Sequence, residues 1–301
     1  MRFIPFFLAF AWGLNWPAVK IALSAFPPFT LRMIGLGSGG LLLMLIALGQ
    51  RRSLRLPRRM WPRVVVAGIF TVAVFNFATA LAQLNTSTSR AAVLTFTMPM
   101  MSAVLSWLVV GEKMDRRKII ALSLGLVGVV ILAWPVLSAA LVLHDARAYK
   151  GLIFPLVAAF GWAAGSVYLK RWPVAGDRIA ISAWQLLIGA AFGAIGALIF
   201  GERLPDQRLG IPVMLALFHH IVLGTAIAYW LWFILSERVS ATVASLTTLM
   251  VPVVGVLSAM ALVGDRPTTT DWIGFLLVLG GASLIVLGPQ LPGFETARKQ
   301  R

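Results

Sequence analysis

The sequence has no cysteine and little charge of either sign. Without cysteine the chain can form no disulfide, and it offers no thiolate for catalysis or for a metal ion. Charged residues make up 12% of the chain, whereas soluble globular domains carry roughly 25%. Acidic residues are the scarcest, with 10 Asp and Glu against 26 Lys and Arg.

The uncharged parts of the sequence form long apolar runs. Of the 301 residues 59% are hydrophobic, and the mean hydropathy is +0.90. Many runs are about 20 residues long, and a helix of that length crosses a hydrocarbon core of roughly 30 Å. A water-soluble fold could not cover these runs, so the sequence predicts an all-α membrane protein. We predict ten transmembrane helices, at residues 3–21, 29–49, 63–82, 88–109, 117–136, 151–170, 179–200, 212–234, 240–262 and 271–288.

The formal net charge of +16 could indicate a nucleic-acid partner. The positive charge, however, gathers between the predicted spans, and most Lys and Arg fall in alternate loops on one side. That asymmetry is typical of cytoplasmic loops. We therefore predict no nucleic acid, a multi-pass protein of a bacterial-type inner (plasma) membrane, and both termini in the cytoplasm.

The two halves of the chain repeat each other. "FAWGLNWPAVK" at 10–20 corresponds to "FGWAAGSVYLK" at 160–170. Because the N-terminal stretch has this counterpart, we interpret it as the first span rather than as a signal peptide. Each half holds five predicted spans, an odd number, so the second half must be inverted in the membrane. The sequence thus predicts two inverted five-helix repeats, 1–149 and 150–301.

Corresponding apolar segments also carry a proline at mid-length and end in glycine and an acid. They are "LTFTMPMMSAVLSWLVVGEK" at 94–113 and "LTTLMVPVVGVLSAMALVGDR" at 246–266. A proline inside a helix removes a hydrogen bond, so each segment should kink at Pro99 or Pro252. The kink can be a packing feature or a hinge beside a cavity. We expect Pro99 and Pro252 to act as gating hinges.

These segments resemble the EamA-type drug/metabolite transporter superfamily. The resemblance rests on the WG…K openings, on "ALAQLNTSTSRAAVLTFTMPMMSAVLSWLVVGEK", and on "LSERVSATVASLTTLMVPVVGVLSAMALVGDR". Within the superfamily the chain is similar to ten-helix exporters of aromatic amino acids and related metabolites. One departure is Gly264-Asp265, where the family more often has Gly-Glu. The resemblance implies a bundle around a central cavity that opens alternately to each side, lined mainly by the third, fourth, eighth and ninth spans and their neighbours.

Polar residues at membrane depth usually face the protein interior, where they bind substrate or bond to another helix. Asn76 and Gln83 are seven residues apart, so they share one helical face. His219 and His220 lie about 100° apart around their helix, so at most one faces a cavity squarely. Aromatic residues within the spans could stack on a flat substrate, with ordinary core packing as the alternative. The candidate cavity residues are Trp12, Asn15, Asn76, Gln83, Thr95, Met98, Trp162, Tyr168, His219, His220, Tyr229 and Thr248.

Two basic residues, Lys20 and Arg32, fall at the outer ends of predicted spans. We expect both to snorkel to the outer interface. The alternative is that they attract an anionic carboxylate near the cavity mouth.

The acidic residues all fall in loops, at span ends or in the C-terminal tail. Proton antiporters commonly carry a buried carboxylate, so the sequence favours facilitated movement, with histidine-linked proton coupling second. We predict a monomeric exporter of small metabolites, amino acids including aromatic ones, by alternating access, with no cofactor and no metal. The alternative is a multidrug or organic-cation exporter. An enzyme is not expected, because neither G-x-S-x-G nor H-E-x-x-H occurs.

Overall fold

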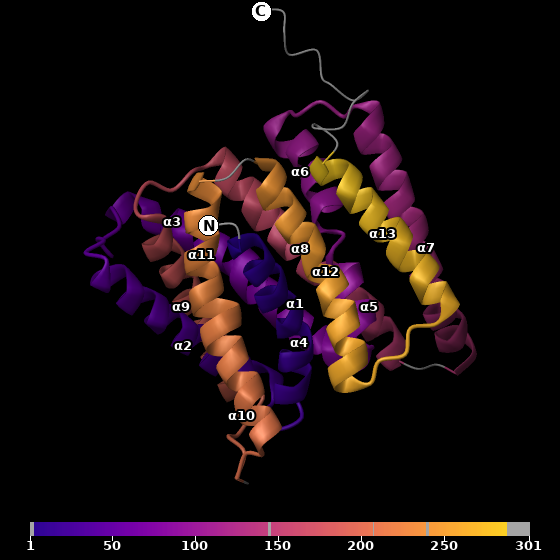
Figure 1. Cartoon of the computed structure of the whole chain (residues 1–301), viewed down its shortest axis with the longest axis horizontal. Coiled ribbons are helices and arrows are strands. Elements are labelled where there is room, and N and C mark those ends of the chain that lie inside the picture. Colours follow the sequence, from indigo (N-terminus) through magenta and orange to yellow (C-terminus); the bar gives the residue numbers. More distant parts are fainter. Residues whose placement is uncertain (1–2, 144–145, 207, 239–240, 288–301) are drawn as a thin grey trace, which may run out of the picture.

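The computed structural model describes residues 3–143, 146–206, 208–238 and 241–287, and every regular element in them is helical (Figure 1). The elements are α1 (Ile4–Ala22), α2 (Pro28–Gly49), η1 (Arg58–Met60), α3 (Trp61–Ala67), η2 (Gly68–Val74), α4 (Phe75–Asn85), α5 (Thr88–Thr95), α6 (Met98–Val110), α7 (Arg116–Leu143), α8 (Ala146–Arg171), α9 (Arg178–Ile199), α10 (Ile211–Phe218), η3 (His219–Ile227), α11 (Ala228–Arg238), α12 (Ala241–Val263) and α13 (Thr269–Leu287).

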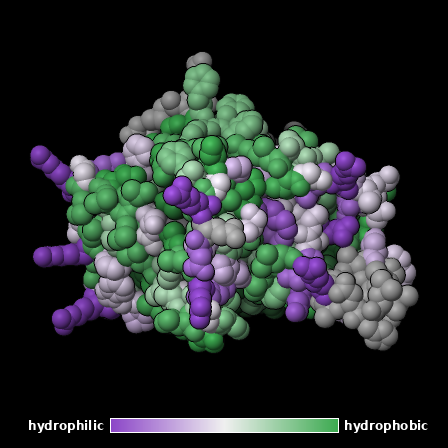
Figure 2. Space-filling view, turned by 90° about the horizontal axis from the view of Figure 1, so that it is seen from below, coloured by the Kyte–Doolittle hydropathy of each residue, from purple (hydrophilic) through white to green (hydrophobic). Residues whose placement is uncertain are grey.

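The described residues contain nine helical segments that are long and apolar enough to cross a membrane, and a shorter apolar helix at Thr247–Val263. Large hydrophobic side chains point outward from these helices, with Leu198 82% exposed and Leu276 71% exposed. Hydrophobic atoms cover much of the face in Figure 2, and hydrophilic side chains stand out at its left edge and across its middle. Such a surface suits lipid rather than water. The prediction of an all-helical, multi-pass membrane protein is confirmed.

The two repeated prolines have different effects on their helices. The predicted span 88–109 is split into α5 and α6, and Pro99 lies in the first turn of α6. Hydroxyl groups bond to the backbone at the break, since Thr95 Oγ1 donates to Ala91 O and Thr97 Oγ1 donates to Leu94 O, both at 2.8 Å. Helix α12, by contrast, continues through Pro252.

The ends of α6 and α12 are built alike. Gly111 has φ +76° and Gly264 has φ +74°, the left-handed conformation that glycine adopts without strain. The next amide in each loop turns back to the helix, where Glu112 N donates to Ser106 O and Asp265 N to Ala259 O. Each helix thus ends in a left-handed glycine cap. This explains why both segments end in glycine.

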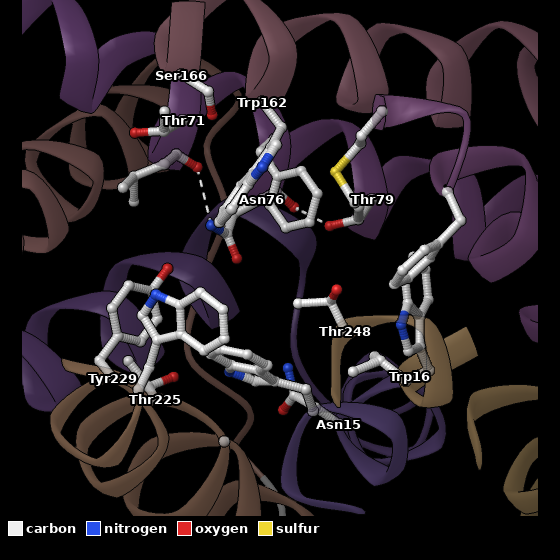
Figure 3. A pocket seen from close by; sticks show the side chains of 18 of the residues that line it. Asn15, Trp16, Thr71, Asn76, Thr79, Trp162, Ser166, Thr225, Tyr229 and Thr248 are labelled. Carbon is white, nitrogen blue, oxygen red and sulfur yellow. Dashed lines mark hydrogen bonds between the residues drawn. The ribbon is translucent and has the colours of Figure 1, made fainter. Parts of the chain in front are cut away.

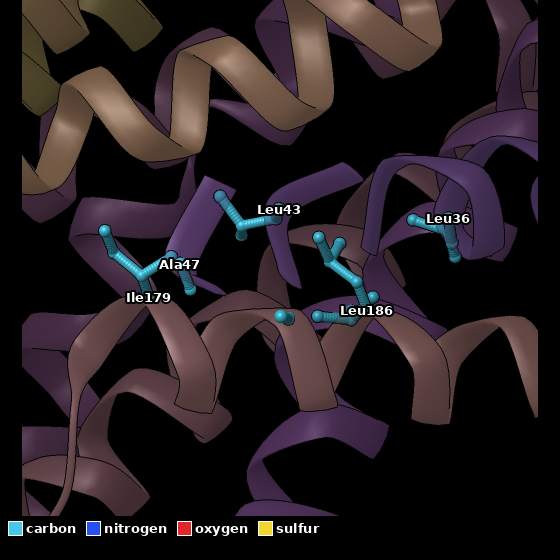
Figure 4. Packing of buried hydrophobic residues seen from close by; sticks show 7 residues of the cluster. Leu36, Leu43, Ala47, Ile179 and Leu186 are labelled. Atoms are coloured by element: carbon cyan, nitrogen blue, oxygen red, sulfur yellow. The ribbon is translucent and has the colours of Figure 1, made fainter. Parts of the chain in front are cut away.

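Helices from the two halves of the chain pack against each other. Helix α2 lies along α9, α7 along α13, and α1 along α12; α7 and α13 run side by side in Figure 1. The interface of α2 and α9 is a core of interleaved aliphatic side chains, shown in Figure 4, that includes Leu36, Leu43, Ala47, Ile179 and Leu186. Polar contacts join both ends of this pair, as Arg52 Nη1 binds Asp177 Oδ2 at 2.9 Å, and Glu202 accepts from Thr30 N at 2.7 Å and from Thr30 Oγ1 at 2.9 Å.

The glycine-rich run 35–40 lets other helices approach α2 closely. A Cβ atom at Gly35 would lie 2.4 Å from His220 Nε2 in η3, closer than real Cβ contacts. A Cβ atom at Gly37 would meet only Ala190 Cβ, at the ordinary distance of 3.5 Å. The short approach at Gly35 therefore fixes the position of the His220 imidazole.

Replacing Glu202 with alanine should destabilise the bundle, because the N-terminus of α2 loses its acceptor. We expect the free energy of unfolding to fall by about 1–2 kcal/mol, as for the loss of a helix N-cap. The measurement is the thermal melting of the purified protein in detergent. Asp206→Ala is the matched control, because Asp206 is exposed in the same loop. Equal melting temperatures for the two variants would contradict the capping role.

Replacing Gly35 with alanine should displace the His220 imidazole. The added methyl group overpacks the contact between α2 and η3, and such changes typically cost about 1–3 kcal/mol. Gly37→Ala is the control, and it should leave the melting temperature unchanged or raise it slightly, since alanine favours helix. The prediction fails if the two variants melt alike.

Candidate functional site

A cavity of about 450 Å³ lies inside the helix bundle. Its volume is in the range of small-molecule sites in proteins. Its walls come from both halves of the chain. The lining residues include Trp12, Asn15, Trp16, Arg32, Thr71, Phe75, Asn76, Thr79, Gln83, Met98, Pro99, Trp162, Ser166, Gln185, His220, Thr225, Tyr229, Trp232 and Thr248.

Two π-helical segments, η2 and η3, form opposite parts of the cavity wall. The wider turn shifts the helical register, so side chains reach the cavity that a regular α-helix would turn elsewhere. Thr71 in η2 and Thr225 in η3 line the cavity, and their hydroxyls donate to Ala67 O and His220 O at 2.7 Å. Short π-helical segments within α-helices are frequent at functional sites.

Aromatic rings form two clusters on the cavity wall. The Trp12 ring lies 6.3 Å from that of Tyr229 and 5.5 Å from that of Trp232. In the other cluster, the rings of Phe75 and Trp162 are 5.2 Å apart. Figure 3 shows Trp162 and Tyr229 on opposite sides of the pocket. The space between the clusters suits a flat, apolar group.

A chain of hydrogen bonds crosses the cavity wall from α1 to α4. Arg32 Nη1 lies 3.4 Å from His220 Nε2, and His220 Nδ1 lies 2.8 Å from Asn15 Oδ1. A guanidinium has no acceptor, so Nε2 accepts, and Nδ1 carries the proton that is donated to Asn15. At the other end of the chain, Arg32 Nη2 donates to Thr79 Oγ1 at 3.0 Å, and Thr79 Oγ1 donates to Asn76 O at 2.9 Å.

The expectation that Arg32 snorkels to an interface is wrong. Its side chain turns into the bundle, where the residue is 2% exposed and lines the cavity. Lys20 stays at the end of α1, half-buried, and donates to the backbone oxygen of Gln83. Arg32 differs because its partners, Thr79 and His220, lie inward from its Cα.

Most of the other candidates lie on the cavity wall: Trp12, Asn15, Asn76, Gln83, Met98, Pro99, Trp162, His220, Tyr229 and Thr248. Four candidates do not line it. Thr95 is fully buried against its own helix, and His219 Nε2 lies 2.9 Å from Ala11 O. Tyr168 packs on Trp172, with ring centroids 4.9 Å apart, and Pro252 is buried within α12.

Several lining residues were missed by the sequence reasoning. They are Trp16, Thr71, Thr79, Thr225 and Trp232. Thr79 could have been found, because it lies three residues after Asn76 and four before Gln83, on the same helical face. Thr71 and Thr225 face the cavity through π-helical turns, for which the sequence carries no recognisable signal.

Outside the cavity lining, polar contacts join helices at the two ends of the α5–α6 segment. At one end Arg90 binds Asp271, with Nη2 and Oδ1 2.5 Å apart, and Asp265 Oδ2 accepts from Ser89 N at 2.6 Å. At the other end Lys170 pairs with Glu112. The hydrogen bond from Lys170 holds the pKa of the Glu112 carboxyl below its ordinary value.

Comparisons with known proteins identify the chain's relatives. It is 28% identical to the "Uncharacterized transporter YvbV" of Bacillus subtilis, over 93% of this chain and 89% of that protein. It is 26% identical to the "Uncharacterized inner membrane transporter YedA" of Escherichia coli K12, over 95% and 90% of the two chains. It is 23% identical to the "Probable amino-acid metabolite efflux pump" of Salmonella typhimurium, over 95% and 94%.

A solved crystal structure has the same fold, with a TM-score of 0.61 at 24% identity over 93% of this chain and 95% of that one. The model of the EamA-like transporter family matches twice, at residues 3–134 and 149–287. These two matches cover most of the sequence. The chain belongs to the EamA-like transporter family.

Proposed function

We propose that this transporter exports small metabolites, amino acids with aromatic side chains among them, across the inner membrane. The observation that carries the proposal is the cavity itself, which combines two aromatic clusters with a polar wall. The aromatic clusters suit an apolar side chain, and the polar wall suits the charged backbone groups of an amino acid. The name of the Salmonella relative, an amino-acid metabolite efflux pump, supports the same substrate class.

The proposal includes two inverted repeats, 1–149 and 150–301, that together form ten transmembrane helices. The two family matches support it, because each covers one half of the chain. The π-helical segments η2 and η3 also correspond, as each lies within the third predicted span of its half. The contacts between α2 and α9 are reciprocal, since the chain after each helix reaches the start of the other.

Alternating access would then be a rocking of the two halves about the cavity. Pro99, which lines the cavity at the break between α5 and α6, would act as one hinge, and Pro252 in α12 as the other. The contacts at the two ends, Arg90–Asp271 and Lys170–Glu112, would open in turn. We place both termini in the cytoplasm, on the side with most Lys and Arg, and we propose that a monomer is sufficient.

The lining also supports movement down a gradient rather than carboxylate-based proton antiport. Among the described residues of the cavity wall, none is Asp or Glu. A proton could be carried there by His220, but its Nε2 is already an acceptor for Arg32. The same lack of acidic residues weighs against the alternative, an exporter of organic cations, which would need a negative counter-charge.

Counterflow in liposomes tests this function. Purified protein is reconstituted into liposomes loaded with unlabelled phenylalanine, tryptophan or threonine, and entry of the labelled amino acid is followed with and without a pH gradient. We expect counterflow without any gradient, and faster exchange for the aromatic amino acids. Flux that requires the gradient would contradict facilitated movement. No exchange of any amino acid would contradict the proposed substrate class.

Removal of an aromatic wall should lower the affinity for aromatic substrates selectively. Trp162→Ala opens one side of the cavity, and we expect the affinity for phenylalanine to fall about tenfold, the scale of a lost ring contact and its burial. Exchange of threonine should change less. The control is Trp134→Ala, because Trp134 is 69% exposed on the outer surface. Equal losses for threonine and phenylalanine would contradict a stacking role.

A further inference from the structure

Arg32 is a buried cation whose charge is not neutralised by any described residue. It is 2% exposed, and its hydrogen-bond partners, Thr79 Oγ1 and His220 Nε2, are both neutral acceptors. The ion pairs formed by the described residues do not include Arg32. Its Nε atom is buried without a hydrogen-bond partner. The guanidinium therefore keeps both a full charge and an unused donor.

Such an arrangement is costly inside a membrane. Charged side chains at this depth are rare, and they generally pair with an opposite charge or face a substrate path. Arg32 lies four residues after the start of α2, about 6 Å along the helix, and its side chain forms part of the cavity wall. The missing counter-charge can thus be supplied by a molecule in the cavity.

We propose that Arg32 binds the carboxylate of the transported molecule, and that carboxylates are the substrate class of this cavity. This inference rests on the proposed function, since it assigns a role within the transport cavity. A guanidinium presents parallel donors that fit a carboxylate in a bidentate way. Thr79 and His220 hold the guanidinium in place, and His220 is in turn held by Asn15.

The rest of the cavity wall indicates how tightly the ammonium group of an amino acid would be bound. The described lining has no carboxylate that could pair with an ammonium group. Gln83 Oε1 is buried without a partner, one helical turn beyond Thr79, so it can accept one hydrogen bond from an ammonium. A neutral acceptor contributes much less than an ion pair. The α-ammonium is therefore dispensable, whereas the carboxylate is required.

Four compounds with the same phenyl group test this assignment on the wild-type protein. They are phenylalanine, 3-phenylpropanoate, phenylalaninamide and phenethylamine. Affinity is measured by the rise in melting temperature with ligand concentration in detergent, and exchange by counterflow in liposomes. We expect phenylalanine and 3-phenylpropanoate to bind with similar affinity. The amide and the amine, which leave Arg32 unpaired, should bind about 30-fold more weakly or worse.

The outcomes separate the inference from the function on which it rests. If the amide or the amine binds and exchanges as well as phenylalanine, the carboxylate assignment is overturned while transport stands. If phenylalanine is exchanged but 3-phenylpropanoate is not, the ammonium is required and the substrate class is wrong. If folded protein exchanges none of the four compounds, the proposed function itself fails.

Variants of Arg32 then test whether this side chain binds the carboxylate. Arg32→Gln keeps a donor for Thr79 but removes the charge, and we expect it to melt no lower than the wild type and to lose the stabilisation by carboxylates. Arg32→Lys keeps the charge but lacks the parallel donors of the guanidinium. It should therefore retain a weaker preference for the acid over the amide. Arg59→Gln is the charge-matched control, because Arg59 is exposed, and it should behave as the wild type. A full preference for acids in Arg32→Gln would overturn the assignment.

Discussion

In a lipid bilayer every backbone group that leaves regular helical bonding must find a partner inside the protein. This chain breaks α-helical geometry within its spans at η2, at η3 and between α5 and α6. All three breaks lie beside the cavity, where hydroxyl groups such as those of Thr71, Thr97 and Thr225 bond to nearby carbonyl oxygens. The irregular backbone is thus kept away from lipid, and the same departures from α-helix aim polar side chains at the cavity.

The close packing of α2 sets the position of the charged group in the cavity. Gly35 leaves room for His220, and His220 in turn holds Arg32 together with Thr79. Small residues are favoured at helix contacts in membranes because they let backbones approach. Here the approach serves a polar contact, since a larger side chain at position 35 would occupy the place of the imidazole. Gly35 therefore determines both how closely α2 and η3 pack and where the His220 imidazole lies in the cavity wall.

Much of the fold could be predicted from the sequence, because span length and hydropathy depend only on local composition. The shared face of Asn76 and Gln83 could also be predicted, since seven residues make two helical turns and both line the cavity. The position of the Arg32 side chain could not be predicted. A basic residue one turn inside a span is equally compatible with a side chain that snorkels to the interface and with one that turns into the bundle. What decides between the two is the location of its partners on α4 and η3, and that is set by tertiary packing.

The positive charge in the cavity and the absence of acidic residues from its described wall have a common explanation on the proposed mechanism. Moving one elementary charge through the membrane potential changes the free energy by about 2.3 kcal/mol per 100 mV. In a cell whose interior is negative, this term favours the exit of a carboxylate that has no ammonium, and it is absent for a zwitterion. An exporter of such anions needs no coupled proton. It does need a positive group that lowers the cost of bringing the anion out of water, and Arg32 supplies that charge within a wall that has no described acidic residue.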